Sequence, residues 1–335
     1  MDKKANIYDV AKLAGVSHQT VSRVLNNHAS LKPATREKVE AAIAQLNYRP
    51  SQAARQLVTS KSGMIGLIVA DTNLFGPTSI RNAMENEARD DGYTVTSISV
   101  LQENRDSWIE GIEHLKQLDI DGVITVALPL EIVKTIARAI PTATLVVVDS
   151  EPTSNLDLVN IDNVEGGRVA TQKLIDLGHK EILHIAGLES SYEALMRRQG
   201  YEAAMTTAKL KPWVIQGDWS IDSGYEIGLK ICEAKKQPTA IFCANDHQSL
   251  GLLKALTQKG VQVPEDISVV GFDDIPEAEF FVTSLTTLKQ DFKELGKIAV
   301  NRLLAQMKEK APLQTTLVRP TLIERDSTRA LKGGK

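Results

Sequence analysis

One face of a short predicted helix, residues 18–25, carries side chains that can hydrogen-bond to DNA bases. Apolar side chains define its inward face: Val21, Val24 and Leu25. Polar side chains define its outward face: His18, Gln19, Ser22 and Arg23. A Gln side chain can bond N6 and N7 of adenine, and an Arg side chain can bond O6 and N7 of guanine. The outward face therefore predicts readout of base edges. The alternative interpretation is a small helical protein-interaction module.

Short polar side chains surround this face and suit contacts with phosphates, which fix register rather than sequence. They are Ser17, Thr20, Ser22, Asn26 and Thr35. Residues 1–62 hold ten Lys or Arg against four Asp or Glu, a net charge of +6, in a chain of net charge −3 whose remainder therefore carries −9. A basic segment on an acidic body indicates a polyanionic partner for that segment. Charge alone is equally consistent with a solvated face.

Three helical segments are predicted to hold the polar face outward. The first, residues 7–14, has one apolar side: Ile7, Val10, Ala11 and Ala14. Gly15 suits the end of that helix because glycine tolerates positive φ, and Ser17 suits the N-cap of the next helix. The third segment, residues 33–46, begins with Pro33 and has its own apolar stripe: Val39, Ala42, Ile43 and Leu46. Helix, Gly-containing turn and helix form a helix-turn-helix pattern.

A basic segment, residues 48–57 (YRPSQAARQL), follows the three helices. Pro50 ends the third helix or its tail, and Ser51 could cap a helix of two turns at most. Such a helix is too short to be stable alone in water. Leu57 has no evident apolar partner, which predicts a segment that orders on DNA and inserts Leu57 into the minor groove. The alternative is a linker with one stray leucine.

From Met64 onward, apolar strands alternate with amphipathic helices. The predicted strands are residues 64–71, 94–100, 122–127, 144–149, 181–187, 239–245 and 266–274, and residues 80–91 are predicted to form a helix. Repeated β-α units predict parallel sheets that are covered on both faces. Two sheets are expected, because about 270 residues are too many for one.

Polar residues at the predicted strand ends are candidates for a binding site, because ligands of open α/β sheets bind beyond the carboxyl ends of the strands. They are Asp71, Thr72, Asp149, Asn245, Asp246, Asp273 and Asp274, together with Arg197 at a helix start and Trp219 in a turn. Carboxylates and amides bridge hydroxyl pairs, Arg donates, and an indole covers the apolar face of a sugar ring. The set predicts a sugar site. Taken alone, each residue also fits a cap or turn, and Asp246 is predicted to be an N-cap.

Other function classes find little support. The chain has no GxGxxG, P-loop, HExxH or GxSxG pattern, its histidines are dispersed, and Cys232 and Cys243 lack CxxC spacing, so no enzyme, cofactor or metal is expected. No run of about 18 apolar residues occurs. The N-terminal residues lack the apolar part of a secretory signal, so we expect no membrane partner and a cytoplasmic location. These features weigh against a periplasmic sugar-binding protein and a sugar-processing enzyme.

Residues 7–27 (IYDVAKLAGVSHQTVSRVLNN), 35–50 (TREKVEAAIAQLNYRP) and 53–57 (AARQL) resemble the LacI–GalR family of transcription regulators. The resemblance extends over almost the whole chain. It implies that His18, Gln19 and Arg23 read bases and that Leu57 is the intercalating hinge residue. The expected DNA contacts are Tyr8, Ser17, His18, Gln19, Thr20, Ser22, Arg23, Asn26, Thr35, Ala54 and Leu57. Similar family members carry Tyr where His18 stands, which leaves the operator sequence open.

The same resemblance implies a periplasmic-binding-protein-like core with an effector in the cleft between two subdomains. By motif match, the expected ligand contacts are Leu74, Pro77, Ile80, Asp149, Glu193, Arg197, Trp219, Asn245, Asp273 and Phe292. Galactoside-binding members share the pattern of Asp, Arg, Trp, Asn and Asp. Glu193 stands where they have a small hydroxyl residue, and Gly76 where they have Ala. Glu193 either accepts from sugar hydroxyls or excludes a known ligand.

The predicted architecture is a small all-α helix-turn-helix headpiece and an α/β periplasmic-binding-protein-like core of two doubly wound subdomains. The headpiece takes residues 1–49, a hinge helix and linker take 50–62, and the core takes 63–335. Within the core we expect an N-subdomain of about 63–161 and 291–320 and a C-subdomain of about 162–290 and 321–330.

The expected function is repression of a carbohydrate-utilisation operon, with release from double-stranded operator DNA by a sugar effector of the galactoside class. The alternative is a corepressor-type regulator of the family that responds to another sugar or to a non-sugar metabolite. A homodimer on a pseudo-palindromic operator is expected, because one helix-turn-helix unit buries little surface. The chain ends IERDSTRALKGGK, without the leucine heptads through which a tetrameric family member associates.

Overall fold

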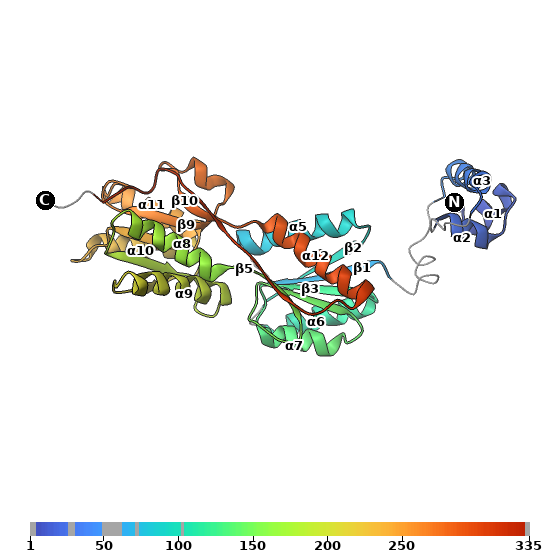
Figure 1. Ribbon diagram of the computed structural model, residues 1–335, viewed down its shortest axis with the longest axis horizontal. Helices are drawn as coiled ribbons and strands as arrows, with labels where there is room; N and C mark the ends of the chain where they lie inside the picture. The colour runs from blue at the N-terminus through green and yellow to red at the C-terminus, as the bar shows by residue number, and fades with distance from the viewer. Residues whose placement is uncertain (1–4, 26–30, 49–61, 71–73, 102–103, 332–335) are drawn as a thin grey trace. The chain divides into compact units, whose positions relative to one another are not determined.

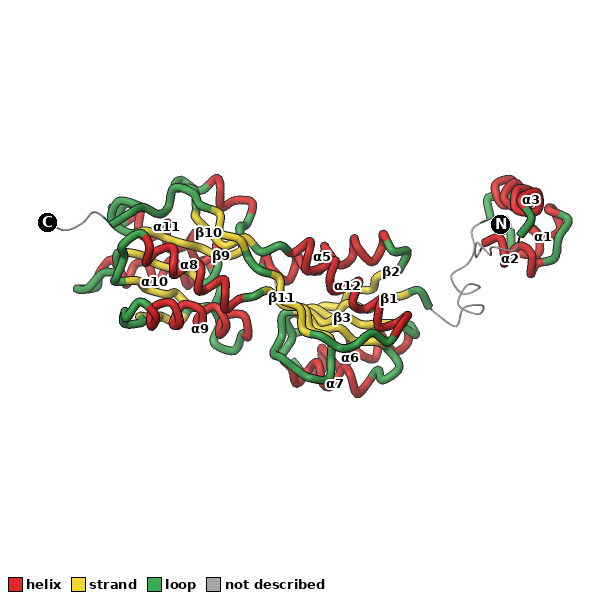
Figure 2. Tube along the Cα trace, in the orientation of Figure 1, coloured by secondary structure: helices red, strands yellow, loops and turns green. Residues whose placement is uncertain are grey.

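The computed structural model describes residues 5–25, 31–48, 62–70, 74–101 and 104–331. The chain divides into two compact units, residues 1–63 and 64–335 (Figure 1). Figure 2 shows that the described part of the first unit is helical, whereas the second contains both helices and sheets. The predicted fold class, a helical headpiece with an α/β core, is confirmed.

The first unit contains the helices α1 (Ile7–Ala14), α2 (His18–Leu25) and α3 (Pro33–Gln45). Its core is small, and its buried members are Val10, Ala11, Val21, Val24, Val39, Ala42 and Tyr48. The predicted inward faces of all three helices supply this cluster. A core of this size leaves the polar face of α2 outside, where it can meet a partner.

The second unit contains two six-stranded sheets, of which the first has the order β11-β5-β4-β3-β1-β2 and is parallel throughout. Its strands are β1 (Met64–Ala70), β2 (Thr94–Val100), β3 (Gly122–Val126), β4 (Thr144–Val148), β5 (Asp157–Ile161) and β11 (Thr315–Val318). Helices α5 (Phe75–Asp90) and α12 (Phe292–Glu309) cover one face, and α6 (Arg105–Gln117) and α7 (Leu130–Ala139) cover the other.

The second sheet has the order β12-β10-β9-β8-β6-β7. Its strands are β6 (Ile182–Ala186), β7 (Trp213–Gln216), β8 (Ala240–Cys243), β9 (Ser268–Asp273), β10 (Thr286–Lys289) and β12 (Thr321–Ile323). Helices α8 (Asn163–Asp176) and α9 (Tyr192–Thr207) pack on one face. Helices α10 (Ile221–Glu233) and α11 (Asp246–Gln258) pack on the other, near the short 3-10 helix η1 (Pro276–Phe280).

The prediction of two sheets covered on both faces is confirmed, with differences in detail. The edge strand β12 runs antiparallel to β10, and α5 begins at Phe75 rather than at residue 80. Five strands were not predicted, since each is short and mixes polar with apolar residues: β5, β7, β10, β11 and β12. The chain passes between the sheets after β5, after β10 and after β11. Among the described helices, none has the length and apolar character needed to cross a bilayer.

Candidate functional sites

The turn between α1 and α2 positions the polar face of the headpiece. Asn6 caps α1: its side chain accepts from the backbone N–H groups of Tyr8 and Asp9, and the Asp9 carboxylate accepts from the N–H of Asn6 at 2.8 Å. Gly15 ends α1 with φ +66°, as predicted. The Ser17 hydroxyl then accepts from the N–H of Thr20 at 3.2 Å, which fits the predicted N-cap of α2.

The outward face of α2 presents the predicted base readers to solvent. His18, Gln19 and Arg23 are exposed, whereas Ser22 is half-buried. Tyr8, from α1, is 65% exposed, and its ring centroid lies 5.2 Å from that of His18. The structure therefore brings Tyr8 to the same surface as the start of α2, and contact of that surface with DNA remains a prediction.

The other predicted DNA contacts are distributed around this surface. Ser17 is exposed, and Thr20 and Thr35 are half-buried near the starts of α2 and α3. Asn26, Ala54 and Leu57 lie outside the described residues, so the hinge with its inserted leucine stays a prediction.

The core contains a cavity of about 590 Å³ that both of its halves line. All ten residues predicted to contact a ligand lie on it: Leu74, Pro77, Ile80, Asp149, Glu193, Arg197, Trp219, Asn245, Asp273 and Phe292. These residues come from segments up to 218 positions apart, counted from Leu74 to Phe292. The structure thus brings the predicted set together in one place, and its role in ligand binding remains a prediction.

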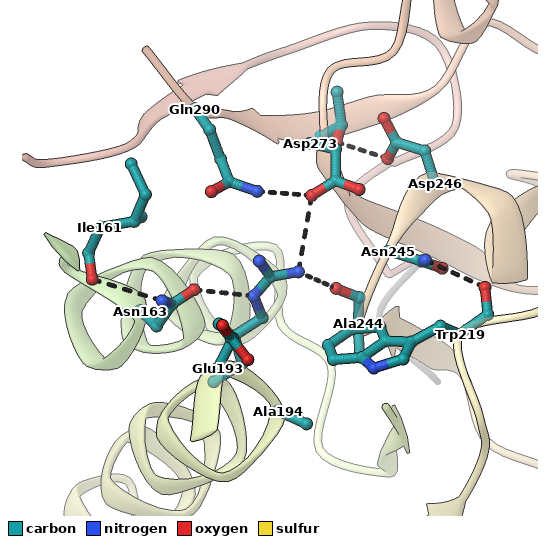
Figure 3. A network of polar contacts seen from close by, with 12 residues as sticks. Ile161, Asn163, Glu193, Ala194, Trp219, Ala244, Asn245, Asp246, Asp273 and Gln290 are labelled. Carbon is teal, nitrogen blue, oxygen red and sulfur yellow. Dashed lines mark hydrogen bonds and ion pairs between the residues drawn. The ribbon is translucent and has the colours of Figure 1, made fainter. Parts of the chain in front are cut away.

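Arg197 is the centre of a buried polar network, and its partners Asn163, Ala244 and Asp273 are labelled in Figure 3. Only 5% of Arg197 is exposed; its Nε donates to Asn163 Oδ1 at 2.8 Å and its Nη1 to the Ala244 carbonyl at 2.6 Å. Nη1 also lies 3.5 Å from Oδ1 of Asp273, which accepts from Gln290 Nε2 at 2.5 Å. Burial lowers the pKa of Arg197 and raises that of Asp273, and their mutual attraction opposes both shifts. The network holds the guanidinium in a fixed orientation at the cavity wall.

Asp149 and Glu193 form an acidic part of the same cavity. Asp149 follows β4 with φ +47°, and its Oδ1 accepts from the N–H of Ile161 at 3.0 Å. Glu193 lies in the first turn of α9, where its carboxylate accepts from the Ser191 hydroxyl at 2.5 Å. Burial raises the pKa of Asp149 to about 7, and the charge of Glu193 adds to that rise. Two carboxylates thus interact at one end of the cavity.

Trp219 and Asn245 form a linked pair on the cavity wall. Asn245 Nδ2 donates to the Trp219 carbonyl at 3.0 Å, and its Oδ1 caps α11 by accepting from the N–H of Gln248. Trp219 has φ +76°, and its ring lies so close to Gly187 that an added Cβ would be 2.4 Å away. This close approach requires glycine at position 187. A buried indole held in this way offers a flat apolar surface to a ligand.

The apolar part of the cavity comes from the first half of the core. Ile80 and Phe292 are buried on α5 and α12, and the Phe292 ring lies 5.8 Å from Phe75, edge to face. Gly76 sits beside this ring: an added Cβ there would be 3.7 Å from it. The cavity therefore joins an apolar wall to a polar one, as small-molecule sites commonly do.

Asp246 and Asp274 differ from the prediction. The N-cap of α11 is Asn245 rather than Asp246. Asp246 is fully buried instead: it accepts from the Thr287 hydroxyl at 2.6 Å and from the N–H of Ile275 at 2.9 Å. Asp274 pairs with Arg325 at 2.7 Å. Both carboxylates fasten strands and loops of the second half to one another, and neither lines the cavity.

Sequence reasoning missed several lining or supporting residues: Asn163, Ser190, Ser191, Tyr192 and Gln290. Gln290 follows β10, a strand that the pattern did not reveal, and Asn163 begins α8 directly after the unpredicted β5. Recognising these two strands would have placed both residues at strand ends, where the remaining candidates were found.

The fold and its two surfaces define a class of protein. A helix-turn-helix unit presents exposed polar side chains, and a separate two-sheet core encloses a cavity with buried charges and an indole. This combination is that of a DNA-binding regulator with a ligand-sensing domain.

Comparison with known proteins agrees with this class. Residues 6–51 match the family described as bacterial regulatory proteins, lacI family, and residues 171–328 match a periplasmic binding protein-like domain. The lactose operon repressor of Escherichia coli K12 is 35% identical over 334 residues, covering 98% of this chain and 92% of the repressor. The repressor PurR of Vibrio cholerae is 36% identical over 337 residues, covering 98% and 99%.

Solved structures show the same relationship. A lac repressor dimer bound to operator and the anti-inducer ONPF aligns with a TM-score of 0.88 and 33% identity, covering 98% of this chain and all of that one. A complex of the regulator CelR with cellobiose aligns with a TM-score of 0.73 and 28% identity over 96% of this chain and 99% of that one. The chain belongs to the lacI family of bacterial regulatory proteins and is a DNA-binding transcriptional repressor.

Proposed function

We propose that this protein represses a carbohydrate-utilisation operon in the cytoplasm and leaves its operator when a sugar, of the galactoside class, fills the core cavity. The observation that carries the proposal is the cavity itself. A fixed guanidinium, carboxylates, an amide and an indole line it together. Carboxylates and amides suit paired hydroxyls, and an indole suits the apolar face of a sugar ring. No catalytic role is proposed for these residues.

Relatives support the choice of a sugar. The solved structures include the lac repressor bound to ONPG and CelR bound to cellobiose. Each aligns with at least 96% of this chain. Their ligands make carbohydrates the first class to test here.

For the DNA-binding part, we propose a homodimer on a pseudo-palindromic operator, as in the solved operator complex of the lac repressor dimer. Residues 1–49 would be the headpiece, 50–62 the hinge with Leu57, and 63–335 the core. Base contacts would come from His18, Gln19 and Arg23, which are exposed on α2. Ligand binding would move the two halves of the core and, through the hinge, alter the spacing of the paired headpieces.

The energetic requirement of this switch is modest. A ligand shifts an equilibrium only by its differential affinity for the two states, and couplings of about 1–3 kcal/mol are typical. A coupling of this size changes DNA affinity about 5- to 150-fold. A short hinge helix that is marginal alone requires little energy to melt.

The test is a DNA-binding titration of the full chain. An operator is first selected from randomised pseudo-palindromic DNA, and its dissociation constant is then measured by fluorescence anisotropy with and without each of a panel of galactosides and other sugars. We expect at least one sugar to weaken binding within the range given above. Thermal-shift measurements on the same panel give an independent readout, because a ligand at 100 times its dissociation constant adds about 2.7 kcal/mol of stability. A panel without effect in either assay would refute the proposal.

The match to PurR supports a second candidate, a corepressor-type response to a non-sugar metabolite. The same titration separates the two, since a corepressor tightens operator binding whereas an inducer weakens it. A purine ligand would favour more aromatic stacking than Trp219 and Phe75 provide, which is why we prefer the sugar.

A further inference from the structure

The charges that line the cavity do not balance. Four lining carboxylates belong to Asp149, Glu151, Glu193 and Asp273, whereas Arg197 is the one Lys or Arg among the described lining residues. Arg197 is directed at Asp273, with 3.5 Å between Nη1 and Oδ1. Arg197 also attracts Glu193 and Asp149, so its single positive charge is shared among several of the lining carboxylates.

Asp149 is the buried member of this acidic part. It is 6% exposed, and Oδ1 accepts from the N–H of Ile161 at 3.0 Å. Among the described residues, nothing donates to Oδ2, although Asp149 lines the cavity. A carboxylate oxygen of a lining residue that no protein group donates to can accept a hydrogen bond from a ligand.

Glu193 adds a second carboxylate beside Asp149. Its Oε2 accepts from Ser191 Oγ at 2.5 Å, and it lies one helical turn before Arg197 on α9. Its charge destabilises the ionised form of Asp149, and burial has the same effect, so the pKa of Asp149 rises to about 7. A neutral hydroxyl can donate to these oxygens but leaves the repulsion in place, whereas a cation relieves it.

We propose that the sugar recognised in this cavity carries a protonated amine that binds between the carboxylates of Asp149 and Glu193. The proposal rests on the proposed function and narrows its ligand class from sugars to amino sugars. The sugar ring would lie against Trp219, and its hydroxyls would meet Arg197, Asn245 and Asp273. Glu193 is then a specificity-determining residue: with a small hydroxyl residue in its place, the same cavity would suit a neutral sugar.

The test compares matched ligands on the full chain by isothermal titration calorimetry. The probes are D-galactosamine and 6-amino-6-deoxy-D-galactose, each beside its N-acetylated form and beside D-galactose, together with the corresponding glucose series. N-acetylation removes the charge and keeps the nitrogen. Hydrogen bonds to charged groups are the stronger ones, so we expect one amine to bind about tenfold or more tighter than both of its neutral counterparts.

Two substitutions of Glu193 test whether its carboxylate causes the preference for an amine. Glu193→Gln keeps the shape of the side chain and removes its charge, and we expect it to reduce the preference for the amine over its neutral counterparts to about threefold or less. Glu193→Ser is a second variant with the same expectation. Glu202→Gln is the matched control on α9, because Glu202 pairs with Arg198 and does not line the cavity; it should keep the full preference.

The possible outcomes distinguish the amino-sugar proposal from the proposed function as a sugar-responsive repressor. If no sugar of either kind binds, the proposed function fails. If neutral sugars bind as tightly as their amines, or if Glu193→Gln and Glu193→Ser both keep the full amine preference, only the amino-sugar proposal is overturned.

Discussion

The headpiece and the core place their candidate functional side chains in opposite surroundings. Tyr8 is 65% exposed and Gln19 lies open on α2, whereas Arg197 is 5% and Asp273 7% exposed. In the headpiece, the polar face of α2 contributes no residue to the small apolar core. In the cavity, the charged groups form hydrogen bonds that join α8, α9 and β9. Substitutions on the polar face of α2 should therefore change DNA binding alone, whereas substitutions of the charged cavity residues should change both ligand binding and stability.

Arg197 offers the largest test of this contrast. We expect Arg197→Leu to abolish detectable sugar binding and to lower the free energy of unfolding by about 3–5 kcal/mol, because it leaves Asp273 as an unpaired buried charge. Chemical denaturation followed by tryptophan fluorescence measures the loss. Arg198→Leu is the matched control, since Arg198 forms an exposed i,i+4 pair with Glu202 that should contribute only about 0.3–0.5 kcal/mol. Equal losses in the two variants would contradict the linkage.

Asp149 should make the stability of the fold depend on pH, because its ionisation destabilises the folded state. Its folded-state pKa of about 7 exceeds the ordinary value of 3.8, so the folded protein keeps a proton that the unfolded chain releases. The contribution of Asp149 to stability is present below pH 3.8 and is lost as the pH rises towards 7. The groups that influence this carboxyl are Glu193 and Arg197.

Asp149→Asn should therefore be more stable than the wild type at pH 8, by a free energy of about 4 kcal/mol, and close to it near pH 4. Asn keeps an oxygen that can accept from Ile161. Urea unfolding of both proteins across this pH range is the measurement. A difference that does not change with pH would show that Asp149 is ionised in the folded state throughout.

These two residues also show how far the sequence could predict the site. Asp149 was identified at a predicted strand end and Arg197 at a predicted helix start, and both also match a family motif. Gly15 and Ser17 were identified because the conformation at a helix end depends on local residue type. The Arg197 partner Asn163 could not be identified in this way. It meets Arg197 because α8 and α9 pack closely, with Gly167 against the Arg197 carbonyl and Gly200 against that of Val164. Such contacts depend on tertiary packing, which no local pattern encodes.

The prediction that Asp246 is the N-cap of α11 was wrong for the same reason. Asn245 and Asp246 are both good N-cap residues, so sequence alone does not choose between them. The structure assigns the cap to Asn245, whose side chain also reaches the Trp219 carbonyl, and directs Asp246 to Thr287 on β10. Because β10 was not predicted, Thr287 could not be identified from the sequence as the partner of Asp246.

Gln19 tests the other side of the comparison. Gln19→Ala should weaken binding to the selected operator by about 1–3 kcal/mol, the value of a good base contact, and leave the unfolding midpoint unchanged. Its side chain is exposed and packs in no core. Fluorescence anisotropy with the operator and with a scrambled duplex is the measurement. A similar loss on both DNAs would mean that Gln19 contacts the phosphate backbone and reads no base.

The smallest expected effect comes from a helix cap and compares the two units directly. Asn6 caps α1 in the headpiece by accepting from the N–H groups of Tyr8 and Asp9, and Asn104 caps α6 in the core by accepting from those of Asp106 and Ser107. Replacing either with Ala removes one such cap, at a cost of about 1 kcal/mol.

The consequences of these two equal changes should differ, because the apolar core of the headpiece is far smaller than the apolar cluster between α6 and the first sheet. Hydrogen exchange should show faster opening of α1–α3 in Asn6→Ala, with weaker operator binding. In Asn104→Ala, exchange should rise only at the start of α6, with operator binding unchanged. If Asn6→Ala alters neither hydrogen exchange nor operator binding, the headpiece is more stable than its small core implies.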